Sequence, residues 1–442
     1  MKRLILEELK AWKSDPKRKP LIIKGARQVG KTYILEHFGK TEFKQTHYFN
    51  FEKKPHLCEL FEGDLDPTRI INALSFQLNT QIDIQHDLII FDEIQACPKA
   101  LTSLKYFSED LPEAYVCCAG SLLGIYLGPV SYPVGKVDHM HMYPMTFLEF
   151  LMALDEKMSV ELLSNLKPNT NIPSTTHHYL WEKLKEYFIV GGLPEVIDIY
   201  RHHRKEMYTA CELARKKQRE LIDDYYSDIA KHAGKINAMH IARLFENIPE
   251  QLGQSQAGSA KKYRFKGAIP GIDRFSKLAP AIDWLENAGL IHKVSIVNQA
   301  KQPLKSYTQA NTFKLFLFDV GILGALSDLH PKTIIEYDYG SYKGYFAENY
   351  IAQAFCAAGH EHLYSWTNKT SEVEFLRQIK GEIVPIEVKS GNVTKAKSLQ
   401  VYCEKYQPAY RTIMSGKSLM LDTKGDVHHY PLYLASFFPI KD

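Results

Sequence analysis

The sequence lacks long hydrophobic runs, paired cysteines and a strong excess of charge of one sign. No uninterrupted apolar segment approaches the roughly 18 residues needed to cross a bilayer, so we expect no transmembrane helix. The N-terminal segment returns to charged residues at Glu7 and Glu8, before the core of a signal peptide could form. We therefore expect the chain to remain in the cytoplasm.

Seven cysteines are scattered through the 442 residues without a C-x-x-C pair. Isolated cysteines in an odd number are typical of reduced thiols in an intracellular protein and argue against a zinc site. Adjacent histidines such as His177 and His178 direct their side chains apart, so they are weak metal ligands. The net charge of +4 does not establish a nucleic-acid partner, but it is compatible with local basic patches.

The first 150 residues alternate short apolar runs with longer mixed segments. This alternation predicts strands separated by helices, and therefore an α/β fold built on a parallel sheet. Because the last candidate strand alternates apolar and polar residues, we expect it at an edge of the sheet. The five expected strands are residues 21–24, 47–51, 88–92, 115–119 and 137–142.

The remainder of the chain suggests three further segments. Residues 151–235 have a helical pattern, interrupted by a polar stretch with two prolines at 167–178 that predicts a loop. Residues 236–311 predict helices followed by a pair of strands, which resembles a winged helix. Residues 312–442 return to a mixed α/β pattern, with the clearest strand at 383–389.

A glycine-rich loop between the first expected strand and the following helix matches the pattern G-x-x-x-x-G-K-[ST]. Its residues are Gly25, Ala26, Arg27, Gln28, Val29, Gly30, Lys31 and Thr32. Glycines allow backbone N–H groups to surround phosphates, and the helix presents its positive end to the anion. We expect Lys31 to contact the β- and γ-phosphates and Thr32 to bind Mg²⁺, so the loop predicts ATP with Mg²⁺ as cofactors.

A second element supports a hydrolysis site at the same edge of the sheet. The apolar run at residues 88–91 ends in Asp92 and Glu93, beside the expected position of the phosphate loop. Asp92 would hold Mg²⁺ through water, and Glu93 would orient or deprotonate the attacking water. Without the phosphate loop, the same two carboxylates would more simply be a solvated turn.

Two other strand ends carry polar residues. Ser121 could reach the γ-phosphate or the attacking water, and Asn50 could hydrogen-bond Glu93 and hold it inactive until a partner arrives. The alternative for both residues is a simple cap at the end of a strand.

The segments 24–32, 50–52, 91–95 and 119–121 together resemble a large family of bacterial and archaeal AAA+ ATPases. Segments 143–151 and 191–195 look like the junction and lid motifs of this family. Segments 318–323 and 388–391 look like its C-terminal domain of unknown function, number 4143. The resemblance implies a five-stranded AAA+ P-loop core (1–150), a helical lid (151–235), a winged helix (236–311) and a nuclease-like α/β domain (312–442).

AAA+ proteins usually complete the site with an arginine from a neighbouring subunit, because an extra cation stabilises charge on the transferred phosphate. The resemblance therefore implies a homo-oligomer or a protein partner. Arg243 and Arg274 are candidates, and Lys136 occupies a position at which relatives often carry arginine. A solvated surface role is the alternative for each of them.

Near the C-terminus, Glu374, Glu387 and Lys389 form an acidic-(x)n-E-x-K pattern typical of metal-dependent nucleases. Glu348, on an expected helix, would be a third acid. Relatives more often have Asp at the position of Glu374, and the longer side chain shifts the carboxylate. The alternative is a nuclease-like fold that only binds nucleic acid or protein partners.

Two basic segments are candidates for nucleic-acid contacts. Residues 261–266 interleave basic and aromatic side chains near the expected wing, which is suited to phosphate-backbone contact. Residues 215–219 lie on an expected helix and predict a solvated face.

Two functions follow from these observations. The first is an ATP-driven AAA+ machine or switch that acts on, or assembles at, DNA or RNA, with metal-dependent nuclease activity as a second candidate activity. The alternative is a nucleotide-gated signalling or defence scaffold that recruits protein partners and cleaves nothing. No membrane partner is expected.

Overall fold

The computed structural model describes residues 1–120, 132–256, 262–272, 274–336, 342–368, 371–391, 396–421 and 427–440. The chain divides into two compact units, residues 2–143 and residues 144–442, the latter with Met1. Within the described residues, none of the helices combines the length and apolar character needed to cross a membrane.

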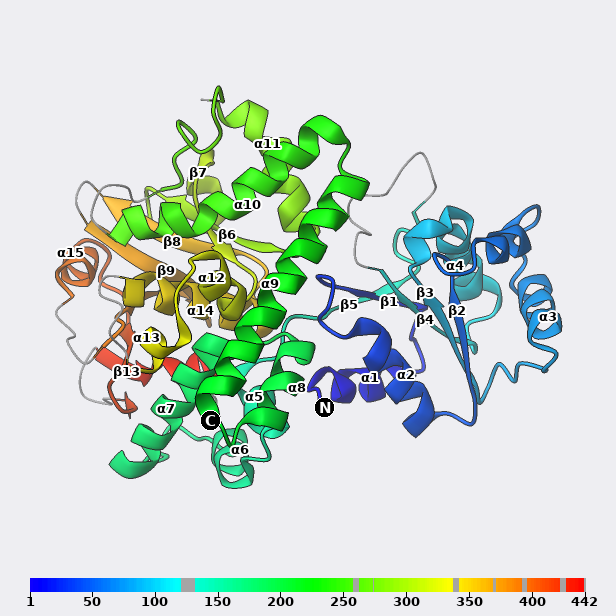
Figure 1. The fold of residues 1–442 in the computed structure, drawn as a ribbon, viewed down its shortest axis with the longest axis horizontal. Coiled ribbons are helices and arrows are strands. Elements are labelled where there is room, and N and C mark those ends of the chain that lie inside the picture. Colours follow the sequence, from blue (N-terminus) through cyan, green and yellow to red (C-terminus); the bar gives the residue numbers. More distant parts are fainter. Residues whose placement is uncertain are drawn as a thin grey trace. The chain divides into compact units, whose positions relative to one another are not determined.

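The N-terminal unit is built on a parallel sheet with the strand order β2-β3-β4-β1-β5 (Figure 1). Its strands are β1 (Leu21–Lys24), β2 (Thr46–Asn50), β3 (Leu88–Asp92), β4 (Tyr115–Ala119) and β5 (Asp138–His141). Its helices are α1 (Ile5–Ser14), α2 (Lys31–Glu42), α3 (Pro67–Leu78) and α4 (Pro98–Asp110), with short 3-10 helices η1 (Pro55–Phe61) and η2 (Ile94–Ala96). The five predicted strands and the edge position of the fifth are confirmed.

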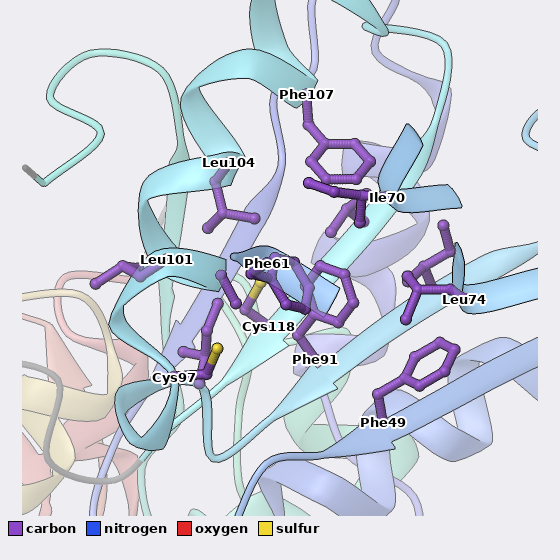
Figure 2. Close-up of a cluster of buried hydrophobic side chains, with 14 of the residues drawn as sticks. Phe49, Phe61, Ile70, Leu74, Phe91, Cys97, Leu101, Leu104, Phe107 and Cys118 are labelled. Carbon is purple, nitrogen blue, oxygen red and sulfur yellow. The ribbon is translucent and has the colours of Figure 1, made fainter. Parts of the chain in front are cut away.

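One aromatic cluster fixes the central strand β3. Phe91 packs edge-on against Phe61 at 5.6 Å between ring centroids, and Phe49 approaches Phe91 at 6.1 Å. Figure 2 shows these rings converging with Ile70 and Leu74 of α3 in a buried cluster. Because every residue of β3 is buried, the position of Asp92 at its end is set by the core.

The C-terminal unit contains an eight-stranded mixed sheet in the order β12-β13-β11-β10-β9-β8-β6-β7. Its strands are β6 (Ile291–Val297), β7 (Thr308–Leu317), β8 (Leu363–Asn368), β9 (Ser371–Ile379), β10 (Glu382–Val388), β11 (Arg411–Ser415), β12 (Met420–Leu421) and β13 (Val427–Pro431).

Helices precede the strands of this sheet in the chain and also connect them. They are α5 (Phe147–Ala153), α6 (Lys157–Ser164), α7 (Ser174–Val190), α8 (Pro194–His203), α9 (Met207–His232), α10 (Lys235–Gln256), α11 (Phe275–Asn287), α12 (Val320–Leu326), α13 (Pro331–Ile335), α14 (Tyr342–Ala357) and α15 (Lys397–Tyr406), with η3 (Leu304–Tyr307) and η4 (Leu432–Phe437). Helix α5 begins with a capping box, in which Thr146 and Glu149 bind each other's backbone N–H. Helix α7 begins at Ser174. The loop predicted at residues 167–178 is therefore too long at its C-terminal end, because residues 174–178 are helical.

The predicted wing does not form a separate sheet. The hairpin β6–β7 joins the C-terminal sheet through parallel pairing of β6 with β8, for example Val294 opposite Leu363. The domain boundary expected between residues 311 and 312 falls inside β7. This long-range pairing depends on residues about 70 positions apart, which a local sequence pattern does not specify.

Candidate functional site

The phosphate loop is shaped by two glycines with positive φ. Gly25 has φ +147°, and a Cβ added there would lie 2.1 Å from the carbonyl oxygen of Met142. Gly30, which caps α2, has φ 95°. Both positions require glycine, because a side chain would either strike the backbone or force a strained conformation.

Arg3 supports the loop from the side. Its Nη1 donates to the carbonyl oxygen of Val29 at 2.7 Å, and its Nη2 donates to that of Tyr143 at 2.7 Å. The side chain is buried, so these bonds lie in a protected environment. This role is not predicted from the sequence, since a basic residue near a terminus carries no pattern that indicates a buried supporting contact.

Lys31 lies inside the loop. Its ammonium donates to the carbonyl oxygens of Gly25 and Ala26 at 2.9 and 2.7 Å, and the residue is buried. The positive charge and the first turn of α2 therefore face the same concavity, as expected for a phosphate-binding loop.

Asp92 is the meeting point of the polar side chains at this edge. Its Oδ2 accepts hydrogen bonds from the Thr32 hydroxyl at 3.0 Å, the Tyr48 hydroxyl at 2.5 Å and the Asn50 amide at 3.2 Å. Strand pairing explains the convergence, because Asn50 lies opposite Asp92 in the register of β2 and β3. The predicted neighbourhood of Thr32 and Asp92 is thus observed.

Tyr48 was missed by the sequence analysis, although a signal existed. It lies two residues before Asn50 on β2, and residues i and i+2 of a strand share a face. Burial raises the pKa of Tyr48 above its ordinary value, and the hydrogen bond to Asp92 raises it further. The phenol therefore remains a proton donor to Asp92 at neutral pH.

Asn50 and Glu93 do not form the predicted pair. Asn50 binds Asp92, and its Oδ1 accepts from the backbone N–H of Lys53 at 2.7 Å. The Glu93 carboxylate instead accepts from the Gln95 amide at 2.5 Å. Glu93 has φ 49°, and this left-handed turn takes its side chain away from the direction that strand alternation would predict.

The Glu93 carboxyl has the character of a base. Burial raises its pKa, and the nearby Asp92 carboxylate adds to the rise, whereas the bond from Gln95 and the charges of Lys31 and Arg27 oppose it. A carboxylate with a raised pKa accepts a proton more readily near neutral pH. Ser121, the other predicted catalytic residue, lies outside the described residues.

The donor set fits a triphosphate with a hard divalent cation. A hydroxyl and a carboxylate, from Thr32 and Asp92, are oxygen ligands of the kind that Mg²⁺ prefers. They meet beside the Lys31 ammonium and the N-terminus of α2, which suit phosphate oxygens. All eight predicted loop residues lie in one strand–loop–helix unit.

In the C-terminal unit, three of the predicted nuclease residues come together. Glu374 of β9 accepts from the backbone N–H of Val388 at 3.1 Å, and Lys389 contacts Glu387 at 2.6 Å. Burial raises the pKa of Glu374, and the carboxylates of Glu387 and Glu348 raise it further.

A residue that the sequence analysis missed, Lys314 of β7, also enters this cluster. Its buried ammonium lies 3.0 Å from Glu348 and also pairs with Glu372. Glu348 is therefore engaged by a lysine. Within the described ranges, no group of three or more His, Cys, Asp or Glu side chains is arranged to hold a metal ion. The predicted three-carboxylate metal site of Glu348, Glu374 and Glu387 is not formed in this arrangement.

The two basic segments have different surroundings. In the first, Tyr263 is buried and stacks near Phe313, while Lys262, Arg264 and Lys266 are exposed. The aromatic rings thus belong to the core, and only the basic side chains face solvent. In the second, Arg215 and Gln218 are 5% and 0% exposed, so the prediction of a solvated face is wrong for both.

Three basic residues are candidates for the cation that would complete a neighbouring site. Arg243 on α10 and Arg274 before α11 are exposed. Lys136 forms an ion pair with Glu109 at 2.9 Å. That any of them completes the nucleotide site of a neighbouring subunit stays a prediction.

Family models match three parts of the chain: an AAA domain (AAA_14) over residues 17–151, a domain of unknown function (DUF8612) over residues 181–333, and a domain of unknown function (DUF4143) over residues 343–433. The first match, the five-stranded parallel sheet and the phosphate loop agree in giving residues 17–151 the fold of an AAA-type P-loop domain. More narrowly, the chain combines this AAA domain with a C-terminal match to DUF4143.

Several solved structures are similar to this chain. The Walker-type ATPase Paby2304 of Pyrococcus abyssi shares 14% identity, with a TM-score of 0.47 over 73% of this chain and 94% of that one. The DNA-bound Drosophila ORC structure shares 14% identity (TM-score 0.30, 76% and 95% covered), and AMPPCP-bound DnaA from Aquifex aeolicus shares 18% (TM-score 0.25, 64% and 86% covered). Similarity at this level carries no functional argument. No curated protein matches the chain.

Proposed function

We propose that the protein binds ATP with Mg²⁺ and hydrolyses it to drive action or assembly on nucleic acid. The observation that carries the proposal is the hydrogen bond between Thr32 and Asp92, 3.0 Å long, next to the buried Lys31 ammonium. It supports the proposal, because two oxygen atoms of the type that binds Mg²⁺ and one positive charge suited to phosphates lie at the same sheet edge.

Each residue has a distinct task in this proposal. Lys31 and the loop N–H groups neutralise and orient the phosphates, and Thr32 and Asp92 would hold Mg²⁺, which would neutralise charge on the phosphates. Glu93 positions a water molecule and accepts its proton. Because Glu93 is bound by Gln95, a rotation of its side chain is required before turnover. This requirement fits an ATPase that hydrolyses ATP slowly until a protein partner or a neighbouring subunit binds.

Exposed cations support the nucleic-acid part of the proposal. Lys262, Arg264 and Lys266 face solvent on alternating positions, whereas Tyr263 is buried. Stacking of bases on aromatic rings is therefore unsupported at this segment, and contact with phosphates is favoured. Binding through phosphates releases counterions, so the affinity should fall steeply with salt.

The test measures ATP and DNA binding separately. Lys31→Ala should abolish ATP binding, while replacing Lys262, Arg264 and Lys266 by Gln should weaken DNA binding about tenfold or more at low salt and flatten its salt dependence. If the wild-type protein has no affinity for DNA or RNA at low salt, the nucleic-acid part is dropped. The alternative, a nucleotide-gated scaffold that recruits protein partners, then takes its place.

For the C-terminal cluster of acidic residues and lysines, we infer that it binds nucleic acid or a protein partner and does not cleave nucleic acid. The observation that favours this function is the buried Lys314, which pairs with Glu348 and Glu372 and supplies positive charge inside the acidic cluster. Equal cleavage of DNA by wild type and Glu387→Ala, with Mg²⁺ or Mn²⁺, is the expected result. Cleavage by wild type that Glu387→Ala removes would establish the metal-dependent nuclease instead.

A further inference from the structure

The phosphate loop carries two cations, and they differ in burial. Lys31 is 8% exposed, and its ammonium binds two carbonyl oxygens of the loop itself. The side chain of Arg27 is 32% exposed, and its Nη2 lies 3.8 Å from Oε2 of Glu52, whose side chain is 43% exposed. Arg27 is therefore the loop cation that a ligand in solution can reach.

The ion pair between Arg27 and Glu52 is weak. Its length of 3.8 Å exceeds the roughly 2.7–2.9 Å of a charge-assisted hydrogen bond. Half-exposed pairs of this kind contribute little to stability, because water screens both charges. The Arg27 guanidinium can therefore exchange this carboxylate for a stronger anionic acceptor at little cost to the fold.

Glu52 lies at the sheet edge that carries the hydrolysis residues. It follows the end of β2 by two residues, and the N–H of Phe51 before it donates to the carbonyl oxygen of Asp92 at 3.1 Å. Strands β2 and β3 are neighbours in the parallel sheet (Figure 1). Because Glu93 follows Asp92 directly, the ion pair holds the Arg27 guanidinium on the side of the loop where Glu93 lies.

The charge of Arg27 acts on Glu93. Burial raises the pKa of the Glu93 carboxyl, and the positive charges of Lys31 and Arg27 oppose that rise. Arg27 thus influences the same carboxyl as Lys31, the cation expected to bind the β- and γ-phosphates.

In the proposed function, this side of the loop is the position of the γ-phosphate. The γ-phosphate would lie beside Glu93, which positions the water that attacks it, and beside the oxygens of Thr32 and Asp92. A guanidinium binds two phosphate oxygens at once, and a terminal phosphate carries more negative charge than the single carboxylate of Glu52. A bound triphosphate therefore competes with Glu52 for Arg27.

We propose that Arg27 contacts the γ-phosphate of bound ATP, and that Glu52 holds the Arg27 guanidinium when no triphosphate is bound. The ion pair opens when ATP binds and closes again when the γ-phosphate is lost. The proposal rests on the proposed function and adds to it a distinction between ATP and ADP. The rotation of Glu93 still requires a partner or a neighbouring subunit.

The test compares the affinity of the full chain for ADP with its affinity for the non-hydrolysable ATP analogue AMPPNP, both with Mg²⁺, by titration calorimetry. Arg27→Gln should raise the dissociation constant of AMPPNP about tenfold or more and that of ADP less than about twofold, since ADP has no γ-phosphate. Arg27→Lys keeps the charge but not the planar fork, so its loss should be intermediate. Arg201→Gln is the matched control, because Arg201 forms a similarly exposed ion pair with Asp198 on α8.

A double-mutant cycle tests the part of Glu52. Glu52→Gln should tighten AMPPNP binding about two- to fivefold, because the triphosphate no longer competes with a carboxylate for Arg27. In the Arg27→Gln background the same change should have little effect. Equal tightening in both backgrounds would show a general effect of charge and would overturn the role of Glu52.

The outcomes separate this proposal from the proposed function. Equal losses of ADP and AMPPNP affinity in Arg27→Gln, or no loss of either, would overturn the contact with the γ-phosphate while ATP binding itself stands. Wild-type protein that binds neither nucleotide would overturn both. If Arg27→Gln does not fold, Arg27→Lys decides by the same comparison of ADP with AMPPNP.

Discussion

At the scale of single residues, Asp92 gathers the polar side chains of the candidate phosphate site through its Oδ2 atom. Lys31, Thr32 and Asp92 lie where the loop pattern and the strand end predicted them. Asn50 donates its hydrogen bond to Asp92 and not to Glu93, because the left-handed backbone at Glu93 turns the Glu93 side chain away. This backbone geometry is set by the packing of the residues that follow β3, and no residue pattern in the sequence predicts it.

Gly25 provides a stability prediction. Gly25→Ala places a Cβ against the carbonyl of Met142 in a positive-φ conformation, so we expect a loss of about 3 kcal/mol in the free energy of unfolding together with loss of nucleotide binding. Gly63→Ala is the matched control, because Gly63 also has positive φ but a Cβ there meets nothing within 4 Å. We expect it to cost about 1 kcal/mol. Equal losses in urea denaturation would contradict the steric account.

Tyr48 provides a prediction about the cation. Tyr48→Phe removes the shortest of the three hydrogen bonds to Asp92 Oδ2, and a carboxylate with fewer donors is a better ligand for Mg²⁺. The Mg²⁺ concentration that half-saturates ATP binding should fall about three- to tenfold, since a hydrogen bond to a charged group contributes about 1.5 kcal/mol or more. Tyr33→Phe, at an exposed position on α2, serves as control. An unchanged or higher Mg²⁺ requirement would show that Tyr48 does not restrain Asp92.

At the scale of elements, the sequence predicted the strands of the first sheet and the strand that carries Glu387, but not the partner strand β7. Lys314 lies within an apolar run of β7, and a lysine in such a run is a signal of a buried, paired charge. Its partners on α14 and β9 could not be predicted, because they follow from the order of strands in the sheet.

Lys314 should therefore control metal binding at the C-terminal cluster. Lys314→Gln removes the ammonium that pairs with Glu348 and Glu372, so the carboxylates should bind Mn²⁺ at least about tenfold more tightly than in wild type. Lys332→Gln, which breaks an exposed ion pair on α13, should leave Mn²⁺ binding unchanged. Mn²⁺ titration followed by electron paramagnetic resonance measures both. Tight Mn²⁺ binding already present in wild type would contradict the compensating role of Lys314.

Strand β6 provides a pH prediction through His292. Burial lowers the pKa of His292 to about 4 in the folded protein, whereas an unfolded histidine has a pKa of about 6.5. The unfolded chain therefore binds the proton first as the pH falls. Stability from the neutral imidazole is complete above pH ~6.5 and declines towards pH ~4, by about 2 kcal/mol at pH 5.

The variant His292→Gln tests this dependence. It should flatten the decline in the free energy of unfolding between pH 6.5 and 4.5, whatever its effect at pH 7. His178→Gln, which changes an exposed histidine on α7, is the comparison. A decline as steep in His292→Gln as in wild type would place the acid sensitivity elsewhere.

At the scale of the whole molecule, the sequence predicted four segments, and the structure groups the chain into two compact units. The AAA-type fold of the first unit follows from the alternation of strands and helices together with the phosphate loop. The joining of β6 and β7 to the C-terminal sheet could not be predicted, because it depends on pairing between strands that are distant in sequence.

The central claim is an ATP hydrolysis site that acts through Lys31 and Glu93 and is completed by a neighbouring subunit or partner. The most direct measurement is ATP binding and turnover across protein concentration, with and without DNA, for wild type, Lys31→Ala and Glu93→Gln. We expect wild-type turnover per molecule to rise with protein concentration, Lys31→Ala to lose binding, and Glu93→Gln to retain binding but lose about 100-fold or more in turnover. ATP binding by Lys31→Ala equal to that of wild type, or undiminished turnover by Glu93→Gln, would contradict the account.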